Sequence, residues 1–284
     1  MIEVNHLYHD YEGKGSCAVK DVSFEIARGE IFGFLGPSGA GKSTVQNILI
    51  GLLAVQRGQV KYEGTSIRDL DARFFNRLGV SFEHPNLYGR LTGYENLKYY
   101  AGLFDGPTAN PSTLLEAVGL TEAAHRRVSA YSKGMRQRLV FARSLINNPR
   151  MLFLDEPTSG LDPNTAGLVK NLIRHKQEQG TTIFLTTHTM TVADELCDRI
   201  AFLNEGQIVG LDTPRNLKLQ YGQRAVQVEY SDNGTVHACL YFLDNPVDNQ
   251  SFSQVIQTAH VQTIHTQEAT LEEIFIKLTG RGLT

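Results

Sequence analysis

The stretch Gly36–Thr44, with the sequence GPSGAGKST, constrains this chain of 284 residues more than any other feature. It follows the short apolar run Ile31–Leu35, and its two spaced glycines precede Lys42 and Ser43. This pattern predicts a strand, a phosphate-binding loop whose backbone N–H groups turn inward, and a helix that starts at Lys42 with its positive end at the same place. The alternative is a glycine-rich turn that matches the pattern by chance, and it leaves the flanking strand and helix unexplained.

The chemistry of this loop predicts a bound nucleotide, ATP, and a magnesium ion. We expect Lys42 to neutralise the β and γ phosphates and the Ser43 hydroxyl to ligate Mg²⁺. The predicted phosphate-binding residues of the loop are Gly36, Pro37, Ser38, Gly39, Ala40, Gly41, Lys42, Ser43 and Thr44.

Two adjacent carboxylates, Asp155 and Glu156, follow the apolar run Met151–Leu154. The carboxyl end of such a strand lies at the sheet edge beside the phosphate-binding loop. We expect Asp155 to hold the water shell of Mg²⁺ and Glu156 to accept a proton from the water that attacks the γ-phosphate. A solvated acidic pair at a strand end is the alternative, and the neighbouring loop favours the catalytic interpretation.

Short β-type runs alternate with helical patterns along most of the chain, which predicts an α/β fold with a P-loop core. Several runs are apolar throughout, as in strands covered on both faces, and the helical patterns Ser43–Leu53 and Pro163–Gln179 lie between them. The early strands are expected to form a smaller antiparallel β lobe. The runs are Ile2–Tyr8, Val22–Ile26, Ile31–Leu35, Gly79–Phe82, Met151–Leu154 and Thr182–Thr186.

Two changes of pattern predict the organisation of the chain. Between Gly93 and Asn148 helical spacing replaces the strand pattern, interrupted only by the loop Pro107–Pro111, which indicates an inserted helical subdomain at about residues 93–148. After Tyr221 and Gly222 the chain alternates in the manner of a hairpin. We therefore expect a main domain at 1–220 and a small α+β appendage at 221–284.

The appendage is expected to begin with a hairpin and to end with a helix. The hairpin turn is predicted at residues 231–234, before the run Val236–Phe242. The final helix is predicted to have Thr270 as its N-cap, Glu273 as the partner of a capping box, and Gly280 as its terminator.

Composition excludes some classes of function. The chain has 27 Lys and Arg residues against 30 Asp and Glu, and its net charge of −3 comes without a long basic block, so we expect no nucleic-acid partner. Cys17, Cys197 and Cys239 are odd in number and lie far apart, which indicates reduced thiols that act as packing residues. The start of the chain does not resemble a leader, and no stretch approaches about 18 consecutive apolar residues. We expect a cytoplasmic protein that reaches a membrane only through a partner.

The residues of the loop and of the acidic strand end, in this order, resemble the ATP-binding cassette (ABC) family over nearly the first 220 positions. The stretch Ser132–Arg138, SKGMRQR, is similar to the signature motif of that family. The resemblance implies that Ser132 and Gly134 face the ATP held by a second copy. Physically, a helix N-terminus with a serine hydroxyl and a glycine amide is an anion receptor, although an ordinary N-capped helix stays open as an alternative.

Further positions match the family in the expected order. Ser159–Asp162 is similar to the D-loop, so the resemblance places Asp162 at the dimer seam, and a plain helix cap before Pro163 is the competing interpretation. His188, which closes the run Ile183–Thr187, corresponds to the switch histidine that contacts the γ-phosphate.

An aromatic residue of the family stacks on adenine, and Tyr11 matches it. Tyr11 lies 25 positions before Gly36. Tyr8 is close to it in the sequence, and a role for Tyr11 in the core remains the alternative.

The chain departs from the family pattern at three positions. Glu83 stands where the family usually has Gln; a carboxylate still ligates Mg²⁺, but it adds negative charge near Glu156 and cannot donate a hydrogen bond. Tyr131 and Lys133 replace the usual Leu and Gly of the signature, as in exporter-type members. The form with Glu83 resembles the branch that exports peptide antibiotics such as lantibiotics or bacitracin.

The resemblance implies a subunit that hydrolyses ATP and powers export of a drug, antibiotic or peptide. Two copies would close head to tail over two MgATP, and the surface around Glu83–Tyr88 would grip a cytoplasmic helix of a separate polytopic membrane permease. Such a subunit is peripheral on the inner face of the cell membrane. An importer ATPase, a non-transport ABC ATPase, a regulatory module that does not hydrolyse ATP, and a nucleotide kinase are the rival interpretations.

Overall fold

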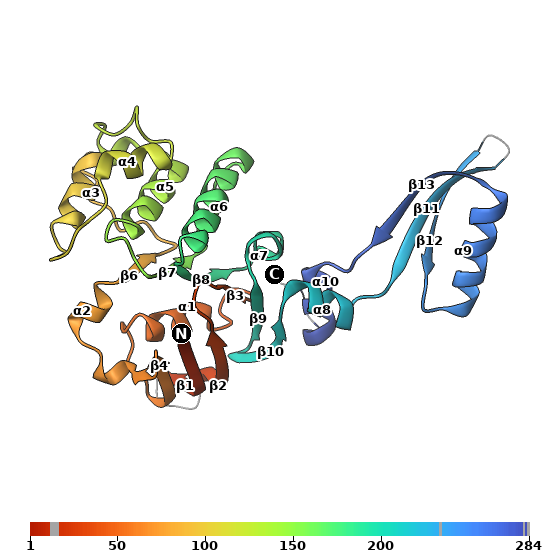
Figure 1. Cartoon of the computed structure of the whole chain (residues 1–284), viewed down its shortest axis with the longest axis horizontal. Helices are drawn as coiled ribbons and strands as arrows, with labels where there is room; N and C mark the ends of the chain where they lie inside the picture. The colour runs from red at the N-terminus through yellow and green to blue at the C-terminus, as the bar shows by residue number, and fades with distance from the viewer. Residues whose placement is uncertain (12–16, 233–234, 281, 283–284) are drawn as a thin grey trace. The chain divides into compact units, whose positions relative to one another are not determined.

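The computed structural model describes residues 1–11, 17–232, 235–280 and 282 of the chain. Two compact units make up these residues, Met1–Leu211 and Asp212–Gly282 (Figure 1). The nucleotide loop and the acidic strand end both belong to the first unit.

A six-stranded sheet forms the centre of the N-terminal unit. Its strand order is β10-β9-β3-β8-β7-β6, and β3 lies between β8 and β9 with both neighbours parallel to it. Every residue of β3, β7 and β8 is buried, which explains why apolar residues dominate these three strands and confirms the α/β prediction. The strands are β3 (Ile31–Leu35), β6 (Leu78–Ser81), β7 (Met151–Asp155), β8 (Thr182–Thr187), β9 (Arg199–Asn204) and β10 (Gln207–Asp212).

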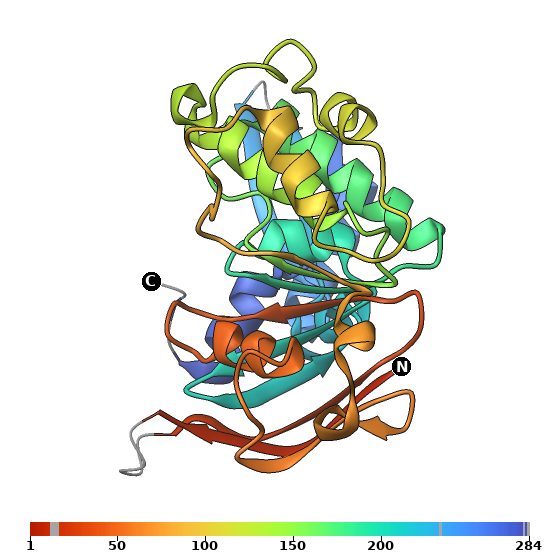
Figure 2. The same ribbon diagram turned by 90° about the vertical axis from the view of Figure 1, so that its left-hand side faces the viewer.

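The early strands form a separate antiparallel sheet, as predicted. Its order is β2-β1-β4-β5, with β1 paired antiparallel to both β2 and β4. Figure 2 shows α1 (Lys42–Leu49) between this sheet and the six-stranded one. The stacked rings of Phe24, Phe32 and Phe184 join the two sheets in one core, which fixes the start of α1 beside β3. The strands are β1 (Ile2–Asp10), β2 (Cys17–Ile26), β4 (Arg57–Tyr62) and β5 (Thr65–Ser66).

The segment between β6 and β7 is helical only in part. Three helices occur there, α3 (Gly93–Ala101), α4 (Pro111–Ala117) and α5 (Lys133–Ser144). The prediction that one loop alone interrupts the helical spacing is wrong, because residues 118–132 form no α-helix and hold turns, an isolated β-bridge from Arg127 to Thr92 and a short 3₁₀ helix, Val128–Ala130. The physical reason is Gly119, whose φ of 65° ends α4 in the left-handed conformation that glycine adopts without strain.

The remaining helices of the N-terminal unit flank the strands. Figures 1 and 2 show α5 and α6 on the side of the six-stranded sheet away from α1. The helices are α2 (Ala72–Phe75), α6 (Pro163–Glu178) and α7 (Met190–Leu196).

The C-terminal unit consists of a three-stranded sheet and three helices. The predicted hairpin is confirmed by β11 and β12, which pair antiparallel from Ala225–Phe242 to Asp232–Thr235, while Asn233 and Gly234 of the predicted turn lie outside the described residues. The sheet order is β12-β11-β13, and α9 packs Phe252 and Val255 on one face of it. The elements are α8 (Pro214–Tyr221), β11 (Ala225–Asp232), β12 (Thr235–Phe242), α9 (Pro246–Thr258), β13 (His260–Gln267) and α10 (Leu271–Thr279).

The caps predicted for the last helix are present. The Thr270 side chain accepts a hydrogen bond from the backbone N–H of Glu273, and the Glu273 carboxylate accepts one from the backbone N–H of Thr270. Gly280 follows with a φ of 70°. The sequence therefore specified both ends of α10 correctly.

The three cysteines differ in burial. Cys197 is buried, which fits its predicted role in packing, and burial raises the pKa of its thiol. Cys17 and Cys239 are half-buried.

Within the described part of the chain, we find no helix with the length and apolar character that crossing a bilayer requires.

Candidate nucleotide site

The loop Gly36–Thr44 joins β3 to α1, and its glycines are required by the backbone. Gly41, immediately before α1, has a φ of 106°, and a Cβ atom there would lie 2.4 Å from the carbonyl oxygen of Ala18. A Cβ atom on Gly36 would lie 2.1 Å from the carbonyl oxygen of Leu203. The chain at both positions passes too close to neighbouring backbone for any side chain, so the loop holds its curved shape before a ligand binds.

Lys42 points back over this loop. Its ammonium donates hydrogen bonds to the carbonyl oxygens of Gly36, at 2.6 Å, and Pro37, at 2.9 Å. Burial lowers the pKa of Lys42, against the opposing effect of Glu156 and other nearby carboxylates. An ammonium has three N–H donors, and two of those on Lys42 hold it against the loop. The third remains available for a phosphate oxygen.

Asp155 and Ser43 bring oxygen atoms together at the end of β7. The Ser43 hydroxyl donates to Asp155 Oδ2 at 3.3 Å, and the Thr186 hydroxyl donates to Asp155 Oδ1. Burial raises the pKa of Asp155, and the hydrogen bond from Thr186 opposes that shift. Hydroxyl and carboxylate oxygens beside a phosphate loop are the donor set that Mg²⁺ prefers, so these residues fit the metal that was predicted.

Glu156 is buried and tightly held. Its Oε1 accepts hydrogen bonds from the backbone N–H of His188, at 2.7 Å, and from His188 Nδ1, at 2.6 Å. Its Oε2 accepts a hydrogen bond of 2.9 Å from the Thr187 hydroxyl. The residue has a φ of 48°, which a side-chain-bearing residue adopts only where its surroundings impose it. The carboxylate therefore has one defined orientation at the carboxyl edge of the sheet.

One pocket of about 470 Å³ brings most of the predicted residues together. Glu83 and His188 reach it from different parts of the chain, and among the described residues Ala18 alone lines it without having been proposed from the sequence. Three predicted loop residues do not line the pocket. Gly36 and Pro37 contribute the carbonyl groups that hold Lys42, and the Ala40 side chain is buried. The predicted residues that line the pocket are Tyr11, Ser38, Gly39, Gly41, Lys42, Ser43, Thr44, Glu83, Asp155, Glu156 and His188.

Tyr11 lies at the mouth of this pocket and is 61% exposed, so the alternative that it is a core residue is wrong. Its hydroxyl is 3.1 Å from Thr44 Oγ1, and its ring meets the His9 ring edge to face at 4.7 Å. Tyr8 is half-buried, with the Arg57 guanidinium over its ring. Of the two tyrosines, Tyr11 alone lines the pocket.

Ser132, Gly134 and Asp162 do not line the pocket of their own chain. Ser132 caps α5 by accepting a hydrogen bond from the Met135 backbone N–H, and Asp162 caps α6 through the Thr165 N–H. Hydrogen bonds from Thr165 lower the pKa of Asp162. These caps confirm the helix starts that were predicted. A Cβ atom on Gly134 would lie 3.9 Å from the carbonyl oxygen of Gly160, so the signature and the D-loop are neighbours.

Sequence reasoning missed Thr186 and Thr187. Both are buried at the end of β8, and their hydroxyls bind Asp155 and Glu156 respectively. The signal was present, because two hydroxyl residues interrupt the apolar character of the strand just before His188. Parallel neighbours end at one edge, so polar residues there face those that end the adjacent strand.

Known families and proteins match this chain in both its N-terminal and its C-terminal part. Residues 19–159 match the family described as ABC transporter, and residues 224–268 match the family described as fluoroquinolone efflux ABC transporter C-terminal domain. The chain is 50% identical over 285 residues to a fluoroquinolones export ATP-binding protein of Mycobacterium tuberculosis (strain ATCC 25618 / H37Rv), with 100% of this chain and 95% of that protein covered. It is 31% identical over 312 residues to a linearmycin resistance ATP-binding protein of Bacillus subtilis (strain 168), with 100% and 99% covered.

Solved structures share the fold of most of the chain. A dimeric ATP-binding cassette in a post-hydrolysis state with ADP and Pi superposes with a TM-score of 0.69 at 28% identity, covering 75% of this chain and 98% of that one. The structure of an ATP-binding subunit of an ABC transporter gives a TM-score of 0.70 at 27% identity, covering 78% and 93%. With the pocket described above, these similarities establish that the chain belongs to the ABC transporter family, as an ATP-binding subunit of its exporter branch.

Proposed function

We propose that this chain hydrolyses ATP to power the export of a drug, an antibiotic or a peptide through a separate polytopic membrane subunit. The observation that carries the proposal is the convergence of Lys42, Ser43, Asp155, Glu156 and His188 on one pocket. An importer ATPase would use the same pocket. The match of residues 224–268 to an efflux family and the names of the relatives favour export of a drug-like cargo.

The loop and Lys42 bind the phosphates in this proposal. Because Gly41 already holds the loop in its curved form, little backbone ordering remains to be done when ATP arrives. Ser43 and Asp155 hold Mg²⁺, and Glu83 supplies a further oxygen from the pocket wall. When bound, Mg²⁺ neutralises phosphate charge that develops during cleavage. Tyr11 at the mouth stacks on adenine.

Glu156 is the proposed general base. Its carboxylate accepts a proton from the water that attacks the γ-phosphate, and the position of the carboxylate is fixed by His188 and the Thr187 hydroxyl. The exposed His188 ring contacts the γ-phosphate in this account, since its side chain is 58% exposed while that of Glu156 is 7% exposed.

A second copy completes the site. Ser132, Gly134 and Asp162 lie outside the pocket of their own chain, and Ser132 starts a helix of 12 residues whose positive end suits an anion. We propose that these residues close over the ATP held by the other copy, as a head-to-tail dimer. A solved relative with ADP and Pi is dimeric, which supports this arrangement.

We propose that residues 1–220 form the motor, with a helical subdomain at about 93–148, and that residues 221–284 form an accessory domain.

The surface around Glu83–Tyr88 is the proposed contact with a cytoplasmic helix of the membrane subunit. Tyr88 and Tyr99 are each 47% exposed, and their rings meet edge to face there. Aromatic side chains exposed in this way are typical of protein interfaces. The subunit would thus be peripheral on the inner face of the membrane.

A transport assay tests this function. The chain is co-expressed with the membrane protein encoded beside it, and the accumulation of a fluoroquinolone in cells is measured. Wild type should lower accumulation, and Lys42→Ala should not, because it removes the charge that holds the phosphates. Lys61→Ala, a substitution outside the pocket, should behave as wild type. Equal accumulation with and without the wild-type pair would reject export of this class of drug.

A further inference from the structure

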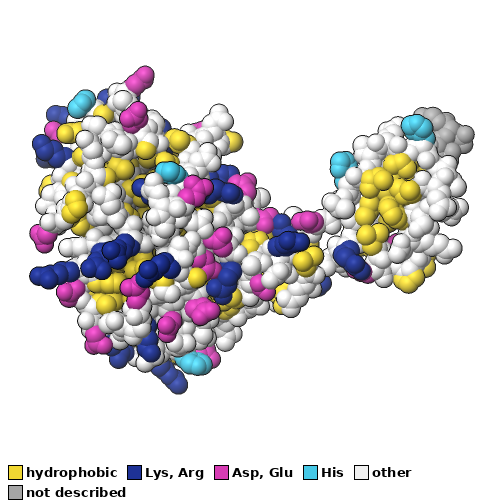
Figure 3. All heavy atoms as spheres, in the orientation of Figure 1, with side chains coloured by type: hydrophobic (Ala, Val, Ile, Leu, Met, Phe, Trp, Pro, Cys, Tyr) yellow, Lys and Arg dark blue, Asp and Glu magenta, His cyan; other side chains and the backbone are white. Residues whose placement is uncertain are grey.

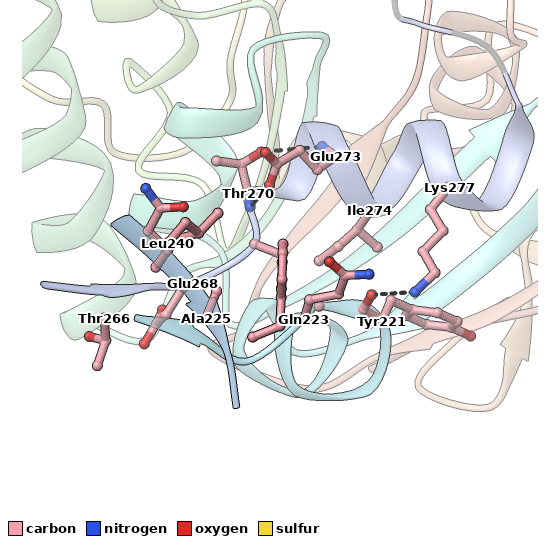
Figure 4. Close-up of a pocket in the computed structure, with 14 residues that line it drawn as sticks. Tyr221, Gln223, Ala225, Leu240, Thr266, Glu268, Thr270, Glu273, Ile274 and Lys277 are labelled. Atoms are coloured by element: carbon pink, nitrogen blue, oxygen red, sulfur yellow. Dashed lines mark hydrogen bonds between the residues drawn. The ribbon is translucent and has the colours of Figure 1, made fainter. Parts of the chain in front are cut away.

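The C-terminal unit holds a second pocket, of about 720 Å³ (Figure 4). Ala225, Leu240 and Phe242 of the sheet form one wall of it. Helix α10 forms a second wall, and the segment Tyr221–Gln223 forms a third. All the described residues that line this pocket belong to this unit, and none of them lines the nucleotide site.

Large apolar side chains in this pocket are exposed. Phe242 is 37% exposed and Leu240 is 44% exposed, whereas Tyr241 between them is buried against Phe252 of α9. The alternation of a strand therefore turns Leu240 and Phe242 to the sheet face opposite α9, where Phe242 is the direct cross-strand partner of Ala225. Figure 3 shows hydrophobic side chains gathered on this unit. Exposed apolar surface inside a concavity is a typical feature of a ligand site.

Charged groups of both signs border the apolar wall. Lys277 is oriented by a hydrogen bond of 2.8 Å from its ammonium to the Tyr221 carbonyl oxygen, which leaves two of the three ammonium donors for a ligand. Figure 4 shows Glu268 on the side of the pocket opposite Lys277. The Glu268 carboxylate lies 3.9 Å from the Lys218 ammonium. Glu273 is held by the capping box. A molecule across the pocket would meet a cation at one end and a carboxylate at the other.

We propose that this pocket binds the exported drug as a flat aromatic molecule that carries both a carboxylate and a protonated amine. The ring system lies on Leu240 and Phe242, the carboxylate meets Lys277, and the amine meets Glu268. The volume falls within the roughly 300 to 1,000 Å³ that drug-sized ligands occupy. This inference rests on the proposed function, drug export, and adds a cargo site on the ATP-binding subunit itself.

Binding of two related probes to the purified full chain tests the proposal. Norfloxacin has a flat aromatic acid and a basic ring amine, and nalidixic acid keeps the flat aromatic acid without that amine. Fluorescence titrations are run with saturating MgATP, so that neither probe can occupy the nucleotide site. Norfloxacin should bind saturably, and nalidixic acid should bind more weakly.

Variants assign the binding to this pocket. Phe242→Ser should weaken the binding of norfloxacin by about tenfold, because the apolar contact between the Phe242 ring and the drug is lost. Ile256→Ser is the matched control, since Ile256 is also 37% exposed, lies on α9 and does not line the pocket. Glu268→Gln should weaken the binding of norfloxacin by about threefold, because the proposed ion pair between Glu268 and the drug amine is solvent-exposed. The binding of nalidixic acid should be unchanged. Thermal denaturation of each variant checks that the unit still folds.

Three results would overturn the inference: no saturable binding of norfloxacin up to about 1 mM, equal effects of Phe242→Ser and Ile256→Ser, or equal effects of Glu268→Gln on both probes. The transport assay separates this failure from failure of the proposed function. If cells with the wild-type pair still accumulate less drug while the purified chain binds none, export stands and the pocket is not a drug site.

Discussion

Three hydrogen bonds fix the carboxylate of Glu156, and all come from Thr187 and His188 at the end of the neighbouring strand. A general base works only when its lone pair points at the proton that it removes, so a side chain that sets this orientation affects the rate without touching ATP. Thr187 is 1% exposed, and its hydroxyl also accepts the Thr189 backbone N–H at 3.0 Å.

Thr187→Val keeps the shape of the side chain and removes both hydrogen bonds. We expect kcat for ATP hydrolysis to fall about tenfold with KM for ATP nearly unchanged, because the phosphate loop is intact. Thr187→Ser, which restores the hydroxyl, should recover most of the rate. Steady-state phosphate release measures both. If Val and Ser variants have the same kcat, Thr187 does not position the base.

Glu83 adds a negative charge to the pocket, and it contributes to the raised pKa of Asp155, after burial and the charge of Glu156. Glu83→Gln should strengthen binding of ATP in the presence of EDTA by about two- to fivefold, a small effect because Glu83 is exposed. Glu116→Gln makes the same change of net charge on α4, outside the pocket, and should have no effect on affinity. Isothermal titration calorimetry decides between them. An unchanged affinity for Glu83→Gln would mean that this carboxylate does not face the phosphates.

At the scale of elements, the site is built where β3, β7 and β8 end together. The loop after β3 bends at Gly41, where a Cβ atom would come within 2.4 Å of the Ala18 carbonyl oxygen. The joint between strand and helix therefore depends on the absence of a side chain.

Gly41→Ala should therefore displace the loop and weaken MgATP binding by at least about tenfold. Gly64 provides the control, since its φ of 82° is equally unfavourable for alanine but no atom lies within 4 Å of its Cβ position. Gly64→Ala should lower thermal stability through backbone strain and leave nucleotide affinity intact. Calorimetric titration with MgATP and thermal denaturation are the two measurements. Similar loss of affinity in both variants would contradict this explanation.

Most elements with a strong pattern were predicted from the sequence, but β9 was missed although its residues Ile200–Leu203 are apolar and buried. The strands β3, β7 and β8 are mostly apolar because they are buried on both faces, and Ser132 and Asp162 mark helix starts through their cap hydrogen bonds. Helix α9 and strand β13 were missed, since α9 has no fully buried residue and therefore little apolar periodicity. Thr186 and Thr187 act through contacts between strands that only the register of β7 and β8 specifies.

At the scale of the whole molecule, we propose that each chain carries two parts of a nucleotide site, neither of which is complete by itself. The pocket at Gly36–Thr44 has the phosphate loop and the proposed base, Glu156, and Ser132, Gly134 and Asp162 do not line it. In this proposal a second copy supplies the missing side, so ATP would favour association because both copies bind the same phosphates. Hydrolysis would then remove part of that differential affinity, and the two copies would separate.

Glu156→Gln tests this account most directly, because it keeps the shape of the side chain and removes the base. With MgATP, we predict that turnover falls by at least about a hundredfold while the protein retains nucleotide and elutes as a dimer in size-exclusion chromatography with light scattering. Without nucleotide the same variant should elute as a monomer. Turnover close to that of wild type, or an ATP-bound variant that remains monomeric, would contradict the assignment of Glu156 and the shared site.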